Sequence, residues 1–545
     1  MNATNKKFEF AGLLLIVLFN LYLIWGFAYY VGSDGSSHIE NAANIIHLLK
    51  NDCANITRLF HFTEAPVPNW ITHLIAMPLL QVFDPVISEK IIISIIIISF
   101  SAGLYRLLRA VATNTYFIFL LLLFVPNAML SGGGYNFMFG LTLYLFALTW
   151  WIKYGNVHNK RNFIKTTALL ITLYFFHIFG LGAFCVSVAA LEFEKLLREK
   201  NITAFLKRSI YYVCAALPVV FMFLIYLTLP KNKVEGVVGF YNRFSHLVFP
   251  ASLYTISQND YWVVMLGGIF IWGLVLIALW SKLLHKNQEQ NPKQNSMLWV
   301  TIFFALAMMF TPATFAGGWV IEPRIELCFF ISLILWLATN HFSAPLKYFI
   351  ITASIFLNIF CLYNKVVMMP VYNEVINTID DANKRIPANS NVFAVNISPL
   401  TVNYNTGEVN YRAAIPDVTG YITARGQCVA EVANYHEGEK NVFPVSYRDE
   451  VNQHITLGHF RTINSLMIVP PIVNIANYEK TTGIKIDYIS IAGKRENMYH
   501  YKPDEKFDEN ELYNNFMAEV NKGFSLFYES PNHIVRIYKA KPSQQ

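Results

Sequence analysis

The stretch Tyr29–Asn44, "YYVGSDGSSHIENAAN", follows directly on a run of apolar residues that begins at Phe10. A run of about 20 apolar residues is long enough to cross the hydrocarbon core of a bilayer. The stretch then presents an aspartate, several serines and a histidine within a few residues. The chain therefore leaves an apolar span and exposes polar, proton-accepting side chains at a membrane surface.

The composition indicates a membrane protein with a soluble part. Of the 545 residues, 54% are hydrophobic and only 14% are charged, whereas a soluble domain has about 25% charged residues. Apolar runs recur as far as Lys365, and charges then return at ordinary frequency. This pattern predicts a polytopic helical membrane domain over 1–365 and a soluble α/β domain over 366–545. We expect about eleven spans, near residues 9–31, 89–108, 113–129, 135–152, 162–176, 178–195, 209–229, 262–283, 297–315, 326–342 and 347–365.

The distribution of charge predicts the topology. Lysines and arginines concentrate in alternate connections, which is typical of segments retained in the cytoplasm. With the N-terminus inside, eleven spans place 366–545 outside, so we expect an integral membrane protein of a bacterial inner membrane type. We attribute the net charge of +7 to this excess of lysine and arginine on the inner side, and it does not indicate binding of nucleic acid. The sequence "FFHIFG" allows either two short spans over 162–195 or one helix, which would reverse every later loop.

Cysteine usage leaves one question open. Cys53 and Cys428 both fall in segments expected outside, where an oxidising compartment permits a disulfide. The pair can form a bridge or remain as two thiols. Because the chain has no CxxC pair and no HExxH motif, a structural zinc or zincin site has no support.

The first outer loop, 32–88, contains two amphipathic segments. Ser37 with Glu40 forms a capping box, so we expect a helix that begins near His38. Its apolar residues share one face, which predicts a helix lying flat on the membrane. The segment 68–83 predicts a second interfacial helix. Asp34 precedes the first helix and has two interpretations, as an ionised proton acceptor or as a simple helix cap.

These features resemble the GT-C glycosyltransferases, in particular the protein O-mannosyltransferases and the aminoarabinose transferases. The resemblance rests on a first span ending in aromatics, an outer aspartate directly after it, a long first outer loop and an external C-terminal domain. It implies a polyprenyl-phosphate-linked sugar donor and gives Asp34 the role of catalytic base. The chain departs from the Asp-Glu pair of the mannosyltransferases, because Gly35 follows Asp34. This departure leaves the class of acceptor open.

The segment His61–His73, "HFTEAPVPNWITH", supplies further candidates. Glu64 is a candidate second catalytic carboxylate, with a solvated side chain in a proline-bent turn as the alternative. The candidates for binding sugar or acceptor in this loop are His38, His61, Asn69 and His73. Three of them are histidines and could hold a metal, but we expect neither a metal nor another cofactor.

Later outer segments add further candidates. "SGGGYNFMFG", 131–140, places Tyr135 and Asn136 as contacts for sugar hydroxyls, or is a tight turn between packed spans. His177 lies at the break between two spans. In "GGWVIEPRIE", 317–326, Arg324 is the expected phosphate ligand because guanidinium pairs with phosphate through two parallel hydrogen bonds. Trp319 is expected to stack on the sugar, and Glu322 to pair with Arg324 in the empty site. Lys233, Arg243 and His246 are weaker phosphate candidates.

Absent motifs favour a lipid-linked donor. The chain has no DxD, no GxGxxG and no Walker A motif, which transferases that use soluble nucleotide sugars commonly need for the diphosphate. The resulting hypothesis is an inverting transfer of sugar to an acceptor hydroxyl at the outer leaflet. Three alternatives remain. They are an en bloc glycan ligase or polymerase, a lipid or glycan transporter, and a non-catalytic scaffold.

Overall fold

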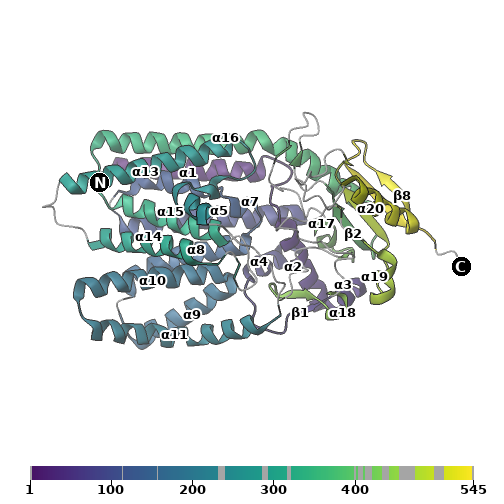
Figure 1. The fold of residues 1–545 in the computed structure, drawn as a ribbon, viewed down its shortest axis with the longest axis horizontal. Coiled ribbons are helices and arrows are strands. Elements are labelled where there is room, and N and C mark those ends of the chain that lie inside the picture. The colour runs from purple at the N-terminus through teal and green to yellow at the C-terminus, as the bar shows by residue number, and fades with distance from the viewer. Residues whose placement is uncertain are drawn as a thin grey trace.

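Long apolar helices run side by side and meet a mixed β-sheet at one end (Figure 1). The computed structural model describes residues 3–112, 114–155, 157–230, 240–284, 292–312, 314–315, 321–397, 401–402, 409–410, 420–432, 441–452, 470, 473–495 and 509–542. The long helices are α1 (Ala3–Trp25), α5 (Pro85–Val111), α8 (Tyr135–Tyr154), α9 (Lys160–Phe176), α10 (Ile178–Glu199), α11 (Ile202–Thr228), α13 (Asp260–Leu284), α14 (Pro292–Phe310), α15 (Ile321–Ala338) and α16 (Ala344–Asn383).

Among the described residues, five helices are long and apolar enough to cross a membrane: α5, α8, α11, α13 and α16. Each expected span overlaps helical structure, but 113–129 is a series of short turns, namely η1 (Thr115–Phe117), α6 (Ile118–Leu121), η2 (Leu122–Phe124) and then α7 (Ala128–Ser131). The segment 162–195 forms two helices, because His177 adopts an extended conformation between α9 and α10. The total of eleven crossings stays a prediction.

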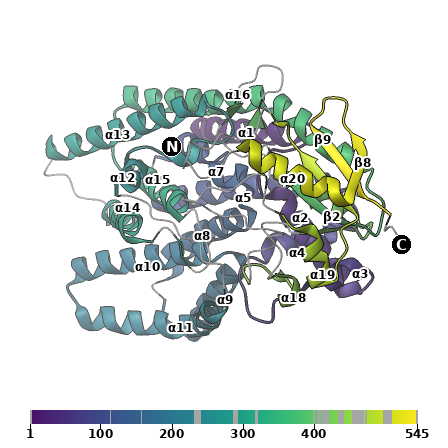
Figure 2. The ribbon, with the colours of Figure 1, turned by 45° about the vertical axis from the view of Figure 1, so that its right-hand side comes forward.

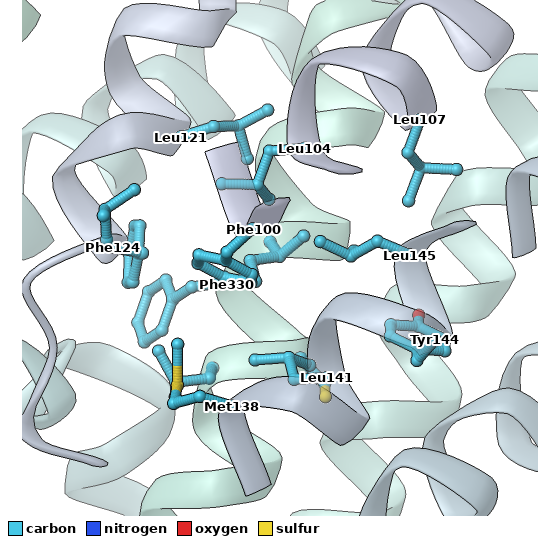
Figure 3. Close-up of a cluster of buried hydrophobic side chains, with 14 of the residues drawn as sticks. Phe100, Leu104, Leu107, Leu121, Phe124, Met138, Leu141, Tyr144, Leu145 and Phe330 are labelled. Carbon is cyan, nitrogen blue, oxygen red and sulfur yellow. The ribbon is translucent and has the colours of Figure 1, made fainter. Parts of the chain in front are cut away.

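The core of the bundle lies where α5, α8 and α15 pack around the short turns (Figure 3). Phe100 and Leu104 of α5, Leu145 of α8 and Phe330 of α15 are at most 1% exposed. Lipid tails are as apolar as these side chains, so close packing, more than the hydrophobic effect, stabilises such an interface. Gly103 illustrates this close approach, since a Cβ added there would lie 3.2 Å from Cβ of Leu145.

The segment predicted to be the first outer loop folds into α2 (Gly35–Lys50), α3 (Ala54–Leu59), β1 (Phe60–Phe62) and α4 (Ile71–Leu80). It and the C-terminal domain keep the names first outer loop and outer domain from this prediction. The expectation that a Ser37–Glu40 box starts the first helix near His38 is wrong, because α2 already begins at Gly35. Asp34 occupies the N-cap position, but its side chain makes no capping hydrogen bond.

The expected membrane-surface position of α2 is also wrong. Most of its polar residues are buried, including Asn41 and Asn44 at no more than 2% exposed. The short helix α17 (Gly420–Ala424) of the outer domain packs on α2, and a Cβ added at Gly420 would lie 2.7 Å from the carbonyl oxygen of Ser36. A helix with one apolar and one polar face can pack between two parts of a protein as well as on a membrane surface. The amphipathic pattern therefore does not distinguish the two positions.

The outer domain is built on a five-stranded mixed sheet of order β5-β2-β7-β9-β8. Its strands are β2 (Asn391–Asn396), β5 (Ala430–Val432), β7 (Tyr488–Ala492), β8 (Phe524–Glu529) and β9 (Val535–Ala540). β2 pairs in parallel with β5 and β7, and β9 runs antiparallel to β7 and β8. The strands predicted at 391–398 and 485–493 and the terminal hairpin are confirmed. The remaining elements are α12 (Phe240–Val248), η3 (Ala251–Leu253), β3 (Thr401–Val402), β4 (Val409–Asn410), β6 (Val445–Tyr447), α18 (Asp449–Asn452), α19 (Ile475–Thr482) and α20 (Glu509–Gly523).

The helix α16 runs from the bundle to the outer domain (Figure 2), and further contacts join the two parts. The expected domain boundary at 365/366 lies inside α16, which runs on to Asn383. Near its end, Asp380 accepts two hydrogen bonds from Arg425, at 2.7 and 2.8 Å, and one from the Tyr29 hydroxyl at 2.8 Å. The first outer loop pairs β1 antiparallel with β6, with Phe60 opposite Tyr447.

A disulfide joins Cys53, just before α3, to Cys428 of the outer domain. The sequence left this pairing open. The two Cα atoms lie 5.4 Å apart and 375 residues apart in sequence. The bridge therefore fixes the first outer loop to the domain that covers it.

We expect the Cys53→Ser variant to lose stability by roughly 2–4 kcal/mol, because it removes a constraint on the unfolded chain. Thermal unfolding of the purified protein in detergent measures the loss, and a reductant should reproduce it in the wild type. Cys214→Ser, at an exposed free cysteine of α11, is the matched control. A Cys53→Ser midpoint equal to that of the control would contradict the expectation.

Candidate functional site

Asp34 is held in place by backbone contacts with the glycine turn before α8. The amide of Ser33 donates to the Ser131 carbonyl at 3.1 Å, and the amide of Asp34 donates to the Gly132 carbonyl at 3.3 Å. Gly133 has φ +77°, and a Cβ there would lie 2.6 Å from the Asp34 nitrogen. The glycines therefore allow two backbone segments to touch.

A buried carboxylate lies beneath this loop. Glu89 of α5 is 1% exposed and accepts hydrogen bonds from the Tyr135 hydroxyl at 2.5 Å and from the Tyr421 hydroxyl. Burial and the negative charge of Glu89 raise the pKa of Tyr421 well above its ordinary value, so this hydroxyl remains a donor. Tyr135 is fully buried with its hydroxyl committed to Glu89. In this structure it supports the loop, and it is not placed as a sugar ligand.

The same carboxylate explains why glycine follows Asp34. A Cβ at Gly35 would lie 1.9 Å from Oε1 of Glu89, and one at Gly32 would lie 2.6 Å from the Tyr135 hydroxyl. No side chain fits at these distances without displacing the carboxylate. The departure from an Asp-Glu pair is therefore a packing requirement of this site.

Two histidines and an asparagine meet beside the loop. The rings of His38 on α2 and His73 on α4 are 5.5 Å apart, and the ring of Phe443 from the outer domain meets both edge-on at 5.6 and 5.9 Å. The Asn136 side chain on α8 accepts from the Thr72 amide at 3.0 Å. The bundle, the first loop and the outer domain each contribute to this cluster.

His73 presents a hydrogen-bond acceptor to the cluster. Its Nδ1 lies 2.9 Å from the carbonyl oxygen of Asn69, so Nδ1 carries the proton and donates. Burial, reinforced by nearby His38, lowers the pKa of His73 to about 3. The imidazole is thus neutral, and its Nε2 lone pair is buried without a partner among the described residues.

His177 presents the complementary group. Its Nδ1 accepts a hydrogen bond from the Phe179 amide at 3.0 Å, so in the neutral ring Nε2 carries the proton. Burial, followed by the positive charge of Arg324, holds the pKa of His177 well below its ordinary value. The Arg324 guanidinium lies over the rings of Phe137 and Phe179 at 5.4 and 5.6 Å.

Several buried polar atoms around these groups have no hydrogen-bond partner among the described residues. They are Oγ of Ser37, Oδ1 of Asn41, Oδ1 of Asn69, Oγ1 of Thr72, Nδ2 of Asn136, Oε1 of Glu322 and Oγ1 of Thr423. Each such atom costs about 1–3 kcal/mol when it is left unsatisfied. Apart from Oε1 of Glu322, these atoms lie on or directly beside α2, α4, α8 and α17, and α2 packs on both α4 and α17 while α4 packs on α8. The arrangement is therefore suited to receive a polar ligand.

Other predicted site residues lie outside the cluster. Glu64 is exposed in the loop after β1, and His61 lies within β1 opposite Ser446. Arg243 on α12 donates to the Met309 carbonyl near the end of α14 at 2.8 Å. Lys233 and Trp319 fall outside the described residues.

Two expectations about charged pairs need correction. His246 on α12 bonds to the buried carboxylate of Glu326, so it is not presented to a phosphate here. Within the described residues no ion pair joins Glu322 to Arg324, because positions two apart on a helix do not face each other. No group of three or more His, Cys, Asp and Glu in the described part of the chain could hold a metal ion.

Sequence reasoning missed four residues of this region. No local sequence pattern marks Tyr421 or Phe443 as part of the site. For Glu89 the one indication is that it is an acid in the first turns of an apolar helix. Lys365 was taken as the end of a span, yet it is 3% exposed and lies 3.4 Å from the buried carboxylate of Asp260. A charged pair buried in an apolar bundle is itself a signal of function.

We expect Gly35→Ala to destabilise the protein by roughly 1–3 kcal/mol through overpacking against Glu89. Gly182 on α10 is the matched control, because a Cβ there meets nothing within 4 Å. Gly182→Ala should be neutral or stabilising by up to about 1 kcal/mol. The measurement is the unfolding midpoint of each variant. Equal midpoints for Gly35→Ala and Gly182→Ala would show that the loop tolerates a side chain.

The depressed pKa of His73 predicts acid sensitivity. Its folded-state pKa of about 3 lies below the ordinary value of 6.5, so the unfolded chain binds the proton more readily. Stability is therefore lost as the pH falls from about 6.5 toward 3, by roughly 2 kcal/mol between pH 7 and pH 5. His73→Gln should show a shallower decline than the wild type or His533→Gln, an exposed control. An unchanged slope in His73→Gln would argue against a neutral, buried His73.

Comparison with known structures identifies the fold. The structure of ArnT from Cupriavidus metallidurans bound to undecaprenyl phosphate is similar over 99% of both chains, with 10% sequence identity and a TM-score of 0.52. An oligosaccharyltransferase from Archaeoglobus fulgidus, tethered to an acceptor peptide, matches 98% of this chain and 74% of its own at 11% identity and a TM-score of 0.37. No protein-family model matches the sequence, and no curated protein matches it significantly. The chain therefore shares the fold of ArnT over its whole length, which is the fold that the resemblance in the sequence predicts.

Proposed function

We propose that the protein transfers a sugar from a polyprenyl-phosphate donor to an acceptor hydroxyl at the outer face of the membrane. The observation that carries this proposal is the cluster of buried polar atoms without partners beside the loop of Asp34. The whole-length similarity to ArnT, solved with undecaprenyl phosphate, supports a lipid-linked donor.

Asp34 is the proposed general base. It stands at the N-terminus of α2, where the helix dipole stabilises a carboxylate, and it forms no capping hydrogen bond. Its backbone is fixed by the glycine turn, which limits where the carboxylate can lie. In the proposed step Asp34 removes the proton of the acceptor hydroxyl as the oxygen attacks the anomeric carbon.

Arg324 is the proposed ligand of the donor phosphate. Its nearness to His177, whose pKa its positive charge lowers, supports this role, whereas Arg243 donates to the Met309 carbonyl near the end of α14. A guanidinium stabilises the charge that grows on the leaving phosphate. The polyprenyl chain adds affinity at roughly 0.8 kcal/mol per buried methylene.

His73 and His177 are proposed to bind hydroxyl groups of the sugar or the acceptor. Nε2 of His73 accepts a hydrogen bond, and Nε2 of neutral His177 donates one. Asn136, with an unpartnered amide nitrogen, adds a donor, and Glu322 adds an acceptor. A hydroxyl both donates and accepts, so this mixture of groups suits a polyol better than a simple anion.

A direct displacement with inversion is the proposed stereochemical course. In the related chemistry of glycosidases, retention uses a second carboxylate as nucleophile about 5 Å from the first. Glu89 accepts hydrogen bonds from two buried tyrosine hydroxyls, and the side chain of Glu64 is exposed. The bonding of Glu89 and the exposure of Glu64 support a direct displacement in which Asp34 acts as the base.

We expect Asp34→Asn to lower the rate of sugar transfer by roughly 10²–10⁴-fold, because it removes the base. Release of polyprenyl phosphate by the purified protein in nanodiscs is the measurement, with a panel of polyprenyl-phosphate mono- and oligosaccharides as donors. Asp52→Asn is the control, as it changes a 47% exposed acid of the same loop.

Full activity of a folded Asp34→Asn protein would remove Asp34 as the base. Turnover of oligosaccharide donors alone would favour en bloc transfer. If neither protein releases polyprenyl phosphate from any donor, the transferase proposal itself fails.

A further inference from the structure

A basic cavity lies at the far ends of α5 and α8. It has a volume of about 700 Å³, and its lining includes Arg106 and Arg109 of α5 with Lys153 of α8. The aromatic rings of Phe146 and Trp150 form part of the same wall. All three cationic side chains are exposed.

The two arginines share the outward face of α5. Leu104 and Leu107 point into the bundle core (Figure 3) and are at most 1% exposed. Arg106 and Arg109 lie on the opposite face, one turn apart. The same exposed face continues toward the middle of α5 with Ile98, which is 51% exposed. An apolar stripe on this helix thus leads directly to the two arginines.

The cavity lies far from the candidate site. Glu89, beneath the loop of Asp34, and Arg106 are 17 residues apart on one helix, from 106 − 89. At 1.5 Å per residue they are separated by about 25 Å, close to the thickness of a hydrocarbon core. The cavity therefore faces the opposite side of the membrane and takes no part in the proposed transfer.

Within the described residues no acidic side chain forms an ion pair with the cations of the cavity. The chain has no Asp or Glu between Glu89 and Glu192. On the neighbouring α10, Glu192 is bonded to Arg208 at 2.6 Å. The Arg106 guanidinium lies 5.6 Å from the ring centre of Phe146, a contact that orients it without removing its charge.

We propose that this cavity binds the phosphate-bearing headgroup of an anionic phospholipid. Its volume lies within the range of about 300–1,000 Å³ for small-ligand pockets, and arginine forks match phosphate oxygens. The acyl chains lie along the exposed stripe of α5 that includes Ile98. Basic pockets between helices at a membrane surface are suited to such headgroups, and Trp150 sits where interfacial aromatic residues are favoured.

The test compares lipid binding by the full chain in detergent, using native mass spectrometry with phosphatidylglycerol or phosphatidylcholine. The variant Arg106→Gln/Arg109→Gln should bind phosphatidylglycerol roughly tenfold or more weakly than the wild type. The control Lys160→Gln/Arg161→Gln removes the same charge from exposed positions at the start of α9. This control should bind as the wild type does.

A second measurement uses the wild type alone and does not depend on the folding of a variant. Hydrogen exchange should show protection of 105–110 and 149–154 by phosphatidylglycerol but not by phosphatidylcholine. Equal binding of both lipids, or equal losses in the two double variants, would overturn the proposal. Protection by inorganic phosphate with no preference for phosphatidylglycerol would also overturn it, since the site would then bind a free anion.

Discussion

Two hydrogen bonds between backbone segments, Ser33 to Ser131 and Asp34 to Gly132, determine how the candidate site is built. They attach the chain that leaves α1 to the turn that begins α8. The close approach requires Gly133 on one side and Gly35 on the other. Once the two segments touch, the space beneath them is just enough for a carboxylate, and Glu89 occupies it. These contacts with the glycine turn therefore position the backbone of Asp34.

The outer domain completes this arrangement. Tyr421 supplies the second hydroxyl for Glu89, and Phe443 closes the edge of the histidine pair. The disulfide and the β1–β6 ladder hold these residues against the first loop. By excluding water they lower the local dielectric, which strengthens each electrostatic interaction at the site. The outer domain thus forms part of the wall of the candidate site and is not a separate lid.

Local patterns were enough to predict the helices, the strand at 391–396 and the terminal hairpin, because apolar runs and alternation depend on neighbouring residues. They also led to Asp34, His73 and Arg324, whose position near span ends is visible in the sequence. They failed for α2, since one amphipathic pattern fits a bilayer surface and a protein interface equally well. They could not find Tyr421 or Phe443, which reach the site from almost 400 residues away in sequence. The reason for a glycine at position 35 is evident only from the structure, where Glu89 leaves no room for a side chain there.

The helix α5 connects the two membrane faces and fixes how deeply the site lies. Its N-terminal turns carry Glu89, sealed by hydroxyl donors, while its last turns carry Arg106 and Arg109, open to the surroundings. Both placements agree with the helix dipole, which favours an acid near the N-terminus and cations near the C-terminus. The arginines resist transfer into the hydrocarbon core and therefore anchor one end of α5 at the membrane surface. Because α5 is a rigid helix of 27 residues, this anchor also sets the height of Glu89 and of the loop of Asp34 that packs on it.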